Sequence, residues 1–92
     1  MKLGFIGTGK ITTSVVSGIC SSKIKYEIIR VSLRNKNLSK KLKQRFKRIK
    51  VEKDNQKIID ESNWIFLAVT PNVGKKIIKN LKFKSNQTII SI

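Results

Sequence analysis

The chain has 92 residues, of which 39% are hydrophobic, and its 21 Lys and Arg against 5 Asp and Glu give a formal net charge of +16. This length excludes more than one domain, and one cysteine without any histidine excludes an internal disulfide and a zinc site. No apolar run approaches the roughly 20 residues of a membrane span, and the N-terminus fails as a signal peptide, so we expect no membrane partner and a cytoplasmic location.

The positive charge raises the question of nucleic-acid binding. Basic residues are spread over nearly every expected helix and turn, although residues 40–50 are locally dense. No strand carries the aromatic side chains on which bases stack. We therefore interpret the charge as a lysine-rich surface and do not expect nucleic acid as a partner.

Residues 2–12 read as a short apolar strand, a glycine turn and the start of a helix. Gly7 suits a tight turn, and Gly9 leaves room for a pyrophosphate whose charge the helix N–H groups can meet. Thr12 departs from the Gly or Ala preferred at the third small position of such loops. The pattern predicts a dinucleotide-binding loop, and the residues expected at the cofactor are Ile6, Gly7, Thr8, Gly9, Lys10 and Ile11.

The next segment supplies the surroundings that such a loop needs. Ile11, Val15, Gly18 and Ile19 fall at helical spacing and predict one stripe against a sheet, with Gly18 allowing a close approach. Residues 26–33 are rich in Ile and Val and predict a buried strand. Strand, helix and strand together have the size of one βαβ unit with a right-handed crossover.

The end of this second strand indicates which nucleotide is bound. An NAD site usually has Asp or Glu there to hold the ribose hydroxyls, but Glu27 lies at the opposite end of the strand. Residues 32–36 offer a hydroxyl, a guanidinium, an amide and an ammonium group instead, and a guanidinium fork matches a phosphate. We therefore predict NADP(H), bound by Ser32, Arg34 and Asn35. The alternative is that Arg34 and Lys36 are ordinary solvated turn residues.

A second helix is predicted by the spacing of Leu38, Leu42 and Phe46, with Asn37 as its N-cap. Residues 49–51 then form a short third strand. A brief helix follows, starting at Asp54 or Asn55.

Residues 64–69 are an unbroken apolar run, as expected for a central parallel strand covered on both faces. Thr70 and Pro71 predict the N-cap and first position of a helix that continues through Val73, Ile77 and Leu81. Residues 87–92 predict a fifth strand.

These alternating elements predict an α/β fold, a doubly wound, Rossmann-like parallel sheet of about five strands in the order 3-2-1-4-5. The crevice of such a sheet lies beyond the carboxyl ends of its strands, at the switch point between the first and fourth. Residues 7–11 and 68–71 would both arrive there. Two separate features of the sequence therefore converge on one place.

Two motifs at a matching distance carry a family resemblance. Residues 3–9, Leu-Gly-Phe-Ile-Gly-Thr-Gly, are similar to the start of the pyrroline-5-carboxylate reductase family, and residues 66–71, Phe-Leu-Ala-Val-Thr-Pro, resemble its Phe-Leu-Ala-Val-Lys-Pro signature. The turn from Ser32 resembles the family's phosphate-binding turn, and Asn55 falls where the family has an asparagine near the adenosine. The chain departs from the family at residues 12–14, 70 and 72. The resemblance implies that further cofactor contacts come from Asn55, Ala68, Val69, Thr70 and Pro71.

The resemblance covers essentially all 92 residues and implies the N-terminal NADP-binding domain of such an enzyme. The family transfers hydride from NADPH to the carbon of a cyclic imine, making proline from 1-pyrroline-5-carboxylate. In the family, a helical C-terminal domain forms the dimer and the substrate pocket, and nothing of it is present in residues 1–92. We therefore expect cofactor binding, a small-molecule substrate only where a second domain is present, and no activity alone. With no His and no paired carboxylate in the expected crevice, we name no catalytic residue.

Three alternatives remain. One is the cofactor domain of a dehydrogenase of the 6-phosphogluconate and 3-hydroxyisobutyrate type, which tolerates Val-Thr-Pro-Asn at residues 69–72, although the Ala-Val-x-Pro context favours the imine reductase. Another is a stand-alone NADP-binding or regulatory module without catalysis. The last is a basic nucleic-acid binder, whose affinity would fall strongly with salt.

Overall fold

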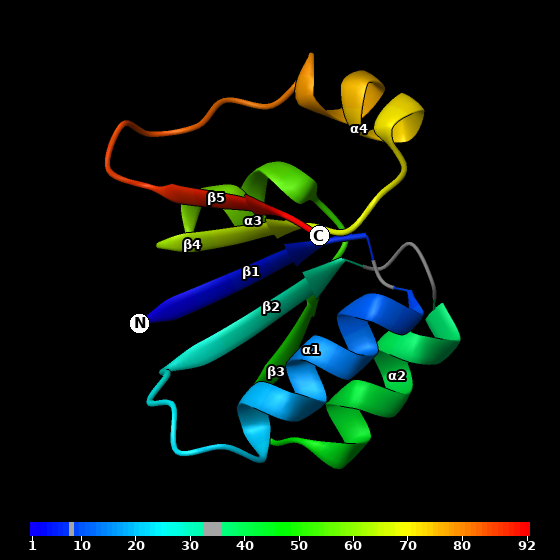
Figure 1. Ribbon diagram of the computed structural model, residues 1–92, viewed down its shortest axis with the longest axis vertical. Helices are drawn as coiled ribbons and strands as arrows, with labels where there is room; N and C mark the ends of the chain where they lie inside the picture. The colour runs from blue at the N-terminus through cyan, green and yellow to red at the C-terminus, as the bar shows by residue number, and fades with distance from the viewer. Residues whose placement is uncertain (8, 33–35) are drawn as a thin grey trace.

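The computed structural model describes residues 1–7, 9–32 and 36–92. Helices and strands alternate along the chain, as β1 (Lys2–Ile6), α1 (Lys10–Cys20), β2 (Ile28–Ser32), α2 (Lys36–Arg45), β3 (Ile49–Glu52), α3 (Asn55–Asp60), β4 (Trp64–Leu67), α4 (Pro71–Ile78) and β5 (Thr88–Ser91). All strands are parallel and form one sheet in the order β3-β2-β1-β4-β5 (Figure 1). The predicted Rossmann-like fold and strand order are confirmed.

Two apolar clusters lie on the two faces of the sheet. Leu3 and Phe5 of β1 pack with Val16 of α1 on one face, and the next residue, Ile6, packs with Ile58 of α3 on the other. Figure 1 shows α1 and α2 side by side at the β3 end of the sheet. Each fully buried side chain of this kind contributes about 1.5–3 kcal/mol. Because β1 is packed on both faces, the position of its carboxyl end is held by the core.

The buried stripe of α1 differs from the prediction. Thr12 and Val16 are its fully buried residues, whereas Ile11 is 59% exposed. Gly18 is exposed, and a Cβ atom there would meet nothing within 4 Å. The predicted close approach at Gly18 is therefore wrong. The helix is rotated toward Thr12 because the hydroxyl of that residue donates to the carbonyl oxygen of Gly7, which removes the cost of burying it.

Several element boundaries also differ. The second strand starts at Ile28, where the register with Lys2 of β1 begins, and not at residue 26. The second helix starts at Lys36, so Asn37 lies in its first turn and the predicted N-cap is wrong. The fourth strand ends at Leu67, because the chain turns toward α4 after the amide of Ala68 donates to the carbonyl oxygen of Ile6.

The starts of the last two helices agree with the prediction. Asp54 caps α3, and its carboxylate accepts a hydrogen bond from the amide of Gln56 at 3.0 Å. Thr70 and Pro71 are the N-cap and first residue of α4, although the Thr70 hydroxyl makes no capping bond. Leu81 lies beyond the end of α4 but still packs against the cluster on that face. Across the described ranges, none of the helices has the length and apolar character needed to cross a bilayer.

Candidate functional site

The turn between β1 and α1 depends on Gly7, whose φ angle is 90°. A non-glycine residue adopts this conformation only with strain. A Cβ atom at Gly7 would also collide with the carbonyl oxygen of Ala68. The backbone after β1 therefore lies against the backbone after β4, at the switch point of the sheet, as the sequence predicts.

Polar side chains fix this turn from two further directions. The amide of Gly7 donates to the Oγ of Ser32 at 3.0 Å, and the carbonyl oxygen of Gly7 accepts from the Oγ1 of Thr12 at 2.7 Å. Ser39 of α2 donates to the carbonyl oxygen of Ser32 at 2.7 Å, which ties the end of β2 to α2. Thr12 is thus a structural part of the site, and neither its role nor that of Ser39 was found by sequence reasoning.

The N-terminus of α1 is open to an anion. Gly9 is its N-cap and has no side chain to cap the helix, no capping bond from the described residues is found, and the first turn contains no acidic residue. A Cβ atom at Gly9 would meet no heavy atom of the described chain within 4 Å. Unpaired N–H groups and the helix dipole favour negative charge at such an end. The end of α1 beside Gly9 therefore has the electrostatic character of an anion site.

A cleft of about 340 Å³ lies beside this turn, on the face of the sheet that α3 covers and against which Ile77 of α4 packs. Four of the predicted site residues meet there. Its wall includes Ile6 at the end of β1, Gly7 in the turn that follows, Ser32 from β2 and Asn55 from α3. Lys53, Val73 and Ile77 also line it and were not predicted. The sequence signal for Lys53 is its position directly after the third strand, at the same edge as the predicted residues, but this signal does not distinguish it from the many other lysines of the chain.

The remaining predicted residues divide between the turn and a second hollow. Ala68 and Val69 contact Gly7, while Lys10 and Ile11 lie exposed in the first turn of α1. A hollow of about 250 Å³ is lined by Leu67, Val69, Thr70, Pro71, Gly74, Lys75, Ile78 and Ser91. The predictions for Thr8, Arg34 and Asn35 lie outside the described residues.

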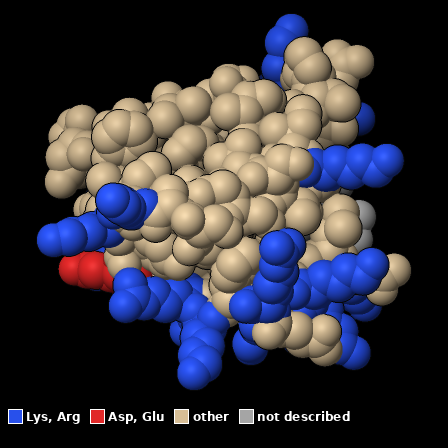
Figure 2. All heavy atoms as spheres, turned by 60° about the horizontal axis from the view of Figure 1, so that its bottom comes forward, with Lys and Arg blue, Asp and Glu red and all other residues tan. Residues whose placement is uncertain are grey.

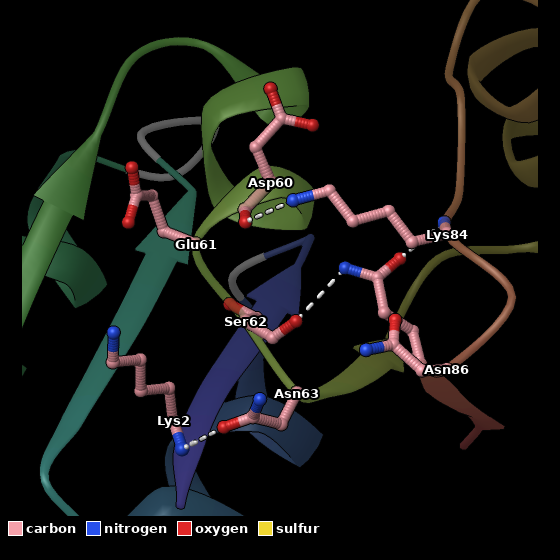
Figure 3. Close-up of a pocket in the computed structure, with 8 residues that line it drawn as sticks. Lys2, Asp60, Glu61, Ser62, Asn63, Lys84 and Asn86 are labelled. Atoms are coloured by element: carbon pink, nitrogen blue, oxygen red, sulfur yellow. Dashed lines mark hydrogen bonds between the residues drawn. The ribbon is translucent and has the colours of Figure 1, made fainter.

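A third, smaller hollow of about 120 Å³ lies at the amino ends of β1 and β4, away from the crevice. Figure 3 shows that its polar groups already bond to one another: the amide of Lys2 donates to Asn63 at 2.9 Å and the ammonium group of Lys84 to the carbonyl oxygen of Asp60 at 3.2 Å. The carboxylates of Asp60 and Glu61 point in different directions (Figure 3). Within the described ranges no group of His, Cys, Asp and Glu could hold a metal ion. The hydrogen bonds around this hollow hold the segment before β5 against the residues before β4, so we do not consider it a candidate site.

The positive charge has a visible distribution on the surface. Figure 2 shows Lys and Arg side chains crowded along the lower part of the molecule, and mostly other residues above them. The local density predicted for residues 40–50 belongs to α2 and the start of β3.

Comparisons with known proteins agree with this geometry. The profile of the family described as "NADP oxidoreductase coenzyme F420-dependent" matches residues 2–92. The chain is 33% identical over 73 residues to ComE operon protein 4 of Bacillus subtilis (strain 168), covering 77% of this chain and 26% of that protein. It is 32% identical over 82 residues to pyrroline-5-carboxylate reductase 3 of Danio rerio, covering 88% and 28%.

A solved structure resembles the fold over nearly the whole chain. The 1-pyrroline-5-carboxylate reductase of Streptococcus pyogenes superposes with a TM-score of 0.76 at 25% identity, covering 99% of this chain and 33% of that one. The chain thus spans about a quarter to a third of the length of these relatives. Its distant homology to pyrroline-5-carboxylate reductases extends over most of its residues.

Proposed function

The chain belongs to the family of NADP oxidoreductases described as coenzyme F420-dependent, and we propose that it is the NADP(H)-binding part of an oxidoreductase of the pyrroline-5-carboxylate reductase type. The β1–α1 turn carries this proposal. The ends of β1, β2 and β4 meet at Gly7, because its amide donates to Ser32, the last residue of β2, and a Cβ atom on it would collide with Ala68 after β4. The uncapped N-terminus of α1 opens beside it. A pyrophosphate bound there would be met by backbone N–H groups rather than by side chains.

The preference for NADP(H) over NAD(H) rests on what stands at the end of β2. Ser32 there presents its hydroxyl to the amide of Gly7, and the sequence continues with Leu33, Arg34 and Asn35 without an acidic residue. A carboxylate at this position would repel a phosphate on the ribose, whereas a guanidinium group would bind it in a bidentate manner. We propose that Arg34 has this role.

The proposed reaction is the reduction of a cyclic imine, as in the relatives named for 1-pyrroline-5-carboxylate. NADPH, when bound, supplies the hydride. The contribution of this chain is orientation, since a crevice fixed by the backbone at Gly7 and Ala68 holds the dinucleotide in one position beside any substrate. A substrate pocket would come from outside residues 1–92. The expected result for the isolated chain is therefore binding without turnover.

Titration of the chain with NADPH, NADH and a short oligonucleotide at physiological salt tests this proposal. NADPH should bind more tightly than NADH, and Arg34→Ala should remove most of that preference, while Arg45→Ala at the other end of α2 should not. Equal binding of NADPH and NADH would refute the role of Arg34. Binding of the oligonucleotide alone, with an affinity that falls steeply with salt, would refute the cofactor function and favour the nucleic-acid alternative.

A measurement of NADPH oxidation distinguishes an imine reductase, a dehydrogenase and a binding module without catalysis. Supplied with a substrate domain of a pyrroline-5-carboxylate reductase, the chain should oxidise NADPH in the presence of a cyclic imine. Oxidation with a hydroxy acid and not with the imine would favour the dehydrogenase alternative. NADPH binding that never leads to oxidation in any such pairing would favour the stand-alone module.

A further inference from the structure

We propose that Lys53 is a specificity-determining residue of the cofactor cleft, and that its ammonium group binds the phosphate carried by the adenosine ribose of NADP(H). This inference rests on the proposed function, because it requires that a dinucleotide occupies the cleft. Lys53 follows β3 directly and lines the cleft of about 340 Å³ together with Ser32 and Asn55. It therefore stands at the same edge of the sheet as the loop that would hold the pyrophosphate.

The strand order decides which half of the dinucleotide lies near Lys53. The pyrophosphate site is at the N-terminus of α1, beyond β1, and the sheet continues from there to β2 and then to β3 at its edge. A dinucleotide crosses such a sheet with its adenosine half beyond the end of β2, on the β3 side of the switch point. The residues after β3, Lys53 and Asn55, therefore face the adenosine end of the cleft.

The two acidic residues next to Lys53 in the sequence, Glu52 and Asp54, both interact with groups other than Lys53. Glu52 is buried, with 6% of its surface exposed. Its carboxylate is approached by the Nε of Arg30 at 3.9 Å, the Nζ of Lys50 at 3.6 Å and the Nζ of Lys57 at 3.6 Å. Three cations around one carboxylate leave this corner of the sheet with an excess of positive charge. Glu52 therefore does not neutralise Lys53.

Asp54 on the other side of Lys53 is used by the fold. Its carboxylate accepts the hydrogen bond from the amide of Gln56 and caps α3. Lys53 itself is exposed, and no ion pair or hydrogen bond of its side chain is found among the described residues. An ammonium group on a long flexible stem is suited to a phosphate as a mobile point charge. The structure thus offers an uncommitted cation where the cofactor of NADP-dependent enzymes has its additional phosphate.

The test compares ligands that differ by that one phosphate. The unaltered chain and the variants Lys53→Ala, Lys53→Arg and Lys47→Ala are titrated calorimetrically at physiological salt with NADPH, NADH, adenosine 2′,5′-bisphosphate and adenosine 5′-monophosphate. Lys47 is the matched control, because it is exposed and lies before β3, at the opposite end of that strand from the cleft. Circular dichroism of each variant checks that it is folded.

We expect Lys53→Ala to weaken NADPH and the bisphosphate about tenfold, the loss of one partly exposed charge-assisted contact, and to leave NADH and the monophosphate nearly unchanged. Lys53→Arg should retain the preference, and Lys47→Ala should behave as the unaltered chain. An equal loss for NADH would mean that Lys53 contacts the pyrophosphate, and no loss for any ligand would mean that it contacts nothing; either result overturns the inference. If the unaltered chain binds none of the ligands, the proposed function fails as well, and a preference for NADPH that is undiminished in Lys53→Ala refutes the role of Lys53 alone.

Discussion

Replacing Gly7 with alanine should damage the fold and the cofactor site together. The φ angle of 90° costs a non-glycine residue about 1–3 kcal/mol. The new methyl group would also press on the carbonyl oxygen of Ala68 and the side chain of Val69, and forcing extra volume into a packed site costs about 1–3 kcal/mol. The expected loss of stability is therefore about 2–6 kcal/mol, a large fraction of the roughly 5–15 kcal/mol of a typical domain.

Replacing Gly9 with alanine tests cofactor binding separately from stability. Gly9 has extended backbone, with a φ angle of −137°, and a methyl group there would meet no atom of the described residues within 4 Å. Gly9→Ala should therefore change stability by less than about 0.5 kcal/mol. Because the methyl group would occupy the space proposed for the phosphates, NADPH binding should weaken by a factor of about ten or more.

Urea unfolding followed by the fluorescence of Trp64, the single tryptophan, measures the stability of both variants, and calorimetric titration measures NADPH binding. With a slope of about 1 kcal/mol per molar urea for a domain of this size, Gly7→Ala should lower the midpoint by about 2 M or more. A Gly7→Ala variant as stable as the unaltered chain would refute the reasoning about the turn. A Gly9→Ala variant that binds NADPH normally would show that the phosphates do not approach Gly9.

Three further substitutions test the described structure. Thr12→Val keeps the shape of the side chain but leaves the carbonyl oxygen of Gly7 without its buried partner, which should cost about 1–3 kcal/mol in urea unfolding. Gly18→Ala should raise the free energy of unfolding by about 0.5–1 kcal/mol, because the position is helical, exposed and uncrowded. The hydrogen bond from Tyr26 to the sulfur of Cys20, at 3.2 Å, and then burial raise the pKa of Tyr26 above its usual 10.0. Stability from this shift is fully present below pH 10.0 and is lost as pH rises through the raised pKa, so Cys20→Ala should move the ultraviolet titration of the single tyrosine to lower pH.

The alternation of elements and the convergence at the switch point could be predicted from the sequence, because both depend on local patterns. Ile65 is buried in β4, within the long apolar run, and the glycine turn contacts the end of that run through Ala68. The apolar run identifies β4 as a strand without any knowledge of its partners. The expected cover on both faces is wrong, because only Ile65 is fully buried, while Trp64 is 37% exposed and Phe66 and Leu67 are half-buried. The meeting of Gly7 and Ala68 then follows from the strand order alone.

The rotation of α1 and the importance of Lys53 could not be predicted in this way. Periodicity alone treats Ile11 as a core residue and Thr12 as a polar one, yet Thr12 is buried because its hydroxyl finds a carbonyl acceptor in the preceding turn. That bond depends on the three-dimensional path of the β1–α1 turn. Lys53 is one of many lysines in the sequence, and it becomes distinctive only when Glu52 and Asp54 are seen to have other partners.

The two kinds of site residue should therefore respond to substitution differently. The loop at Gly7 is bonded to β2 through its amide, to α1 through its carbonyl oxygen, and packed on the end of β4, so its geometry is a consequence of the same contacts that hold the sheet together. Lys53, by contrast, is exposed and supports no described contact of the fold. Substitution of Lys53 should therefore change cofactor preference without a loss of stability, whereas substitution of Gly7 should weaken folding and cofactor binding together.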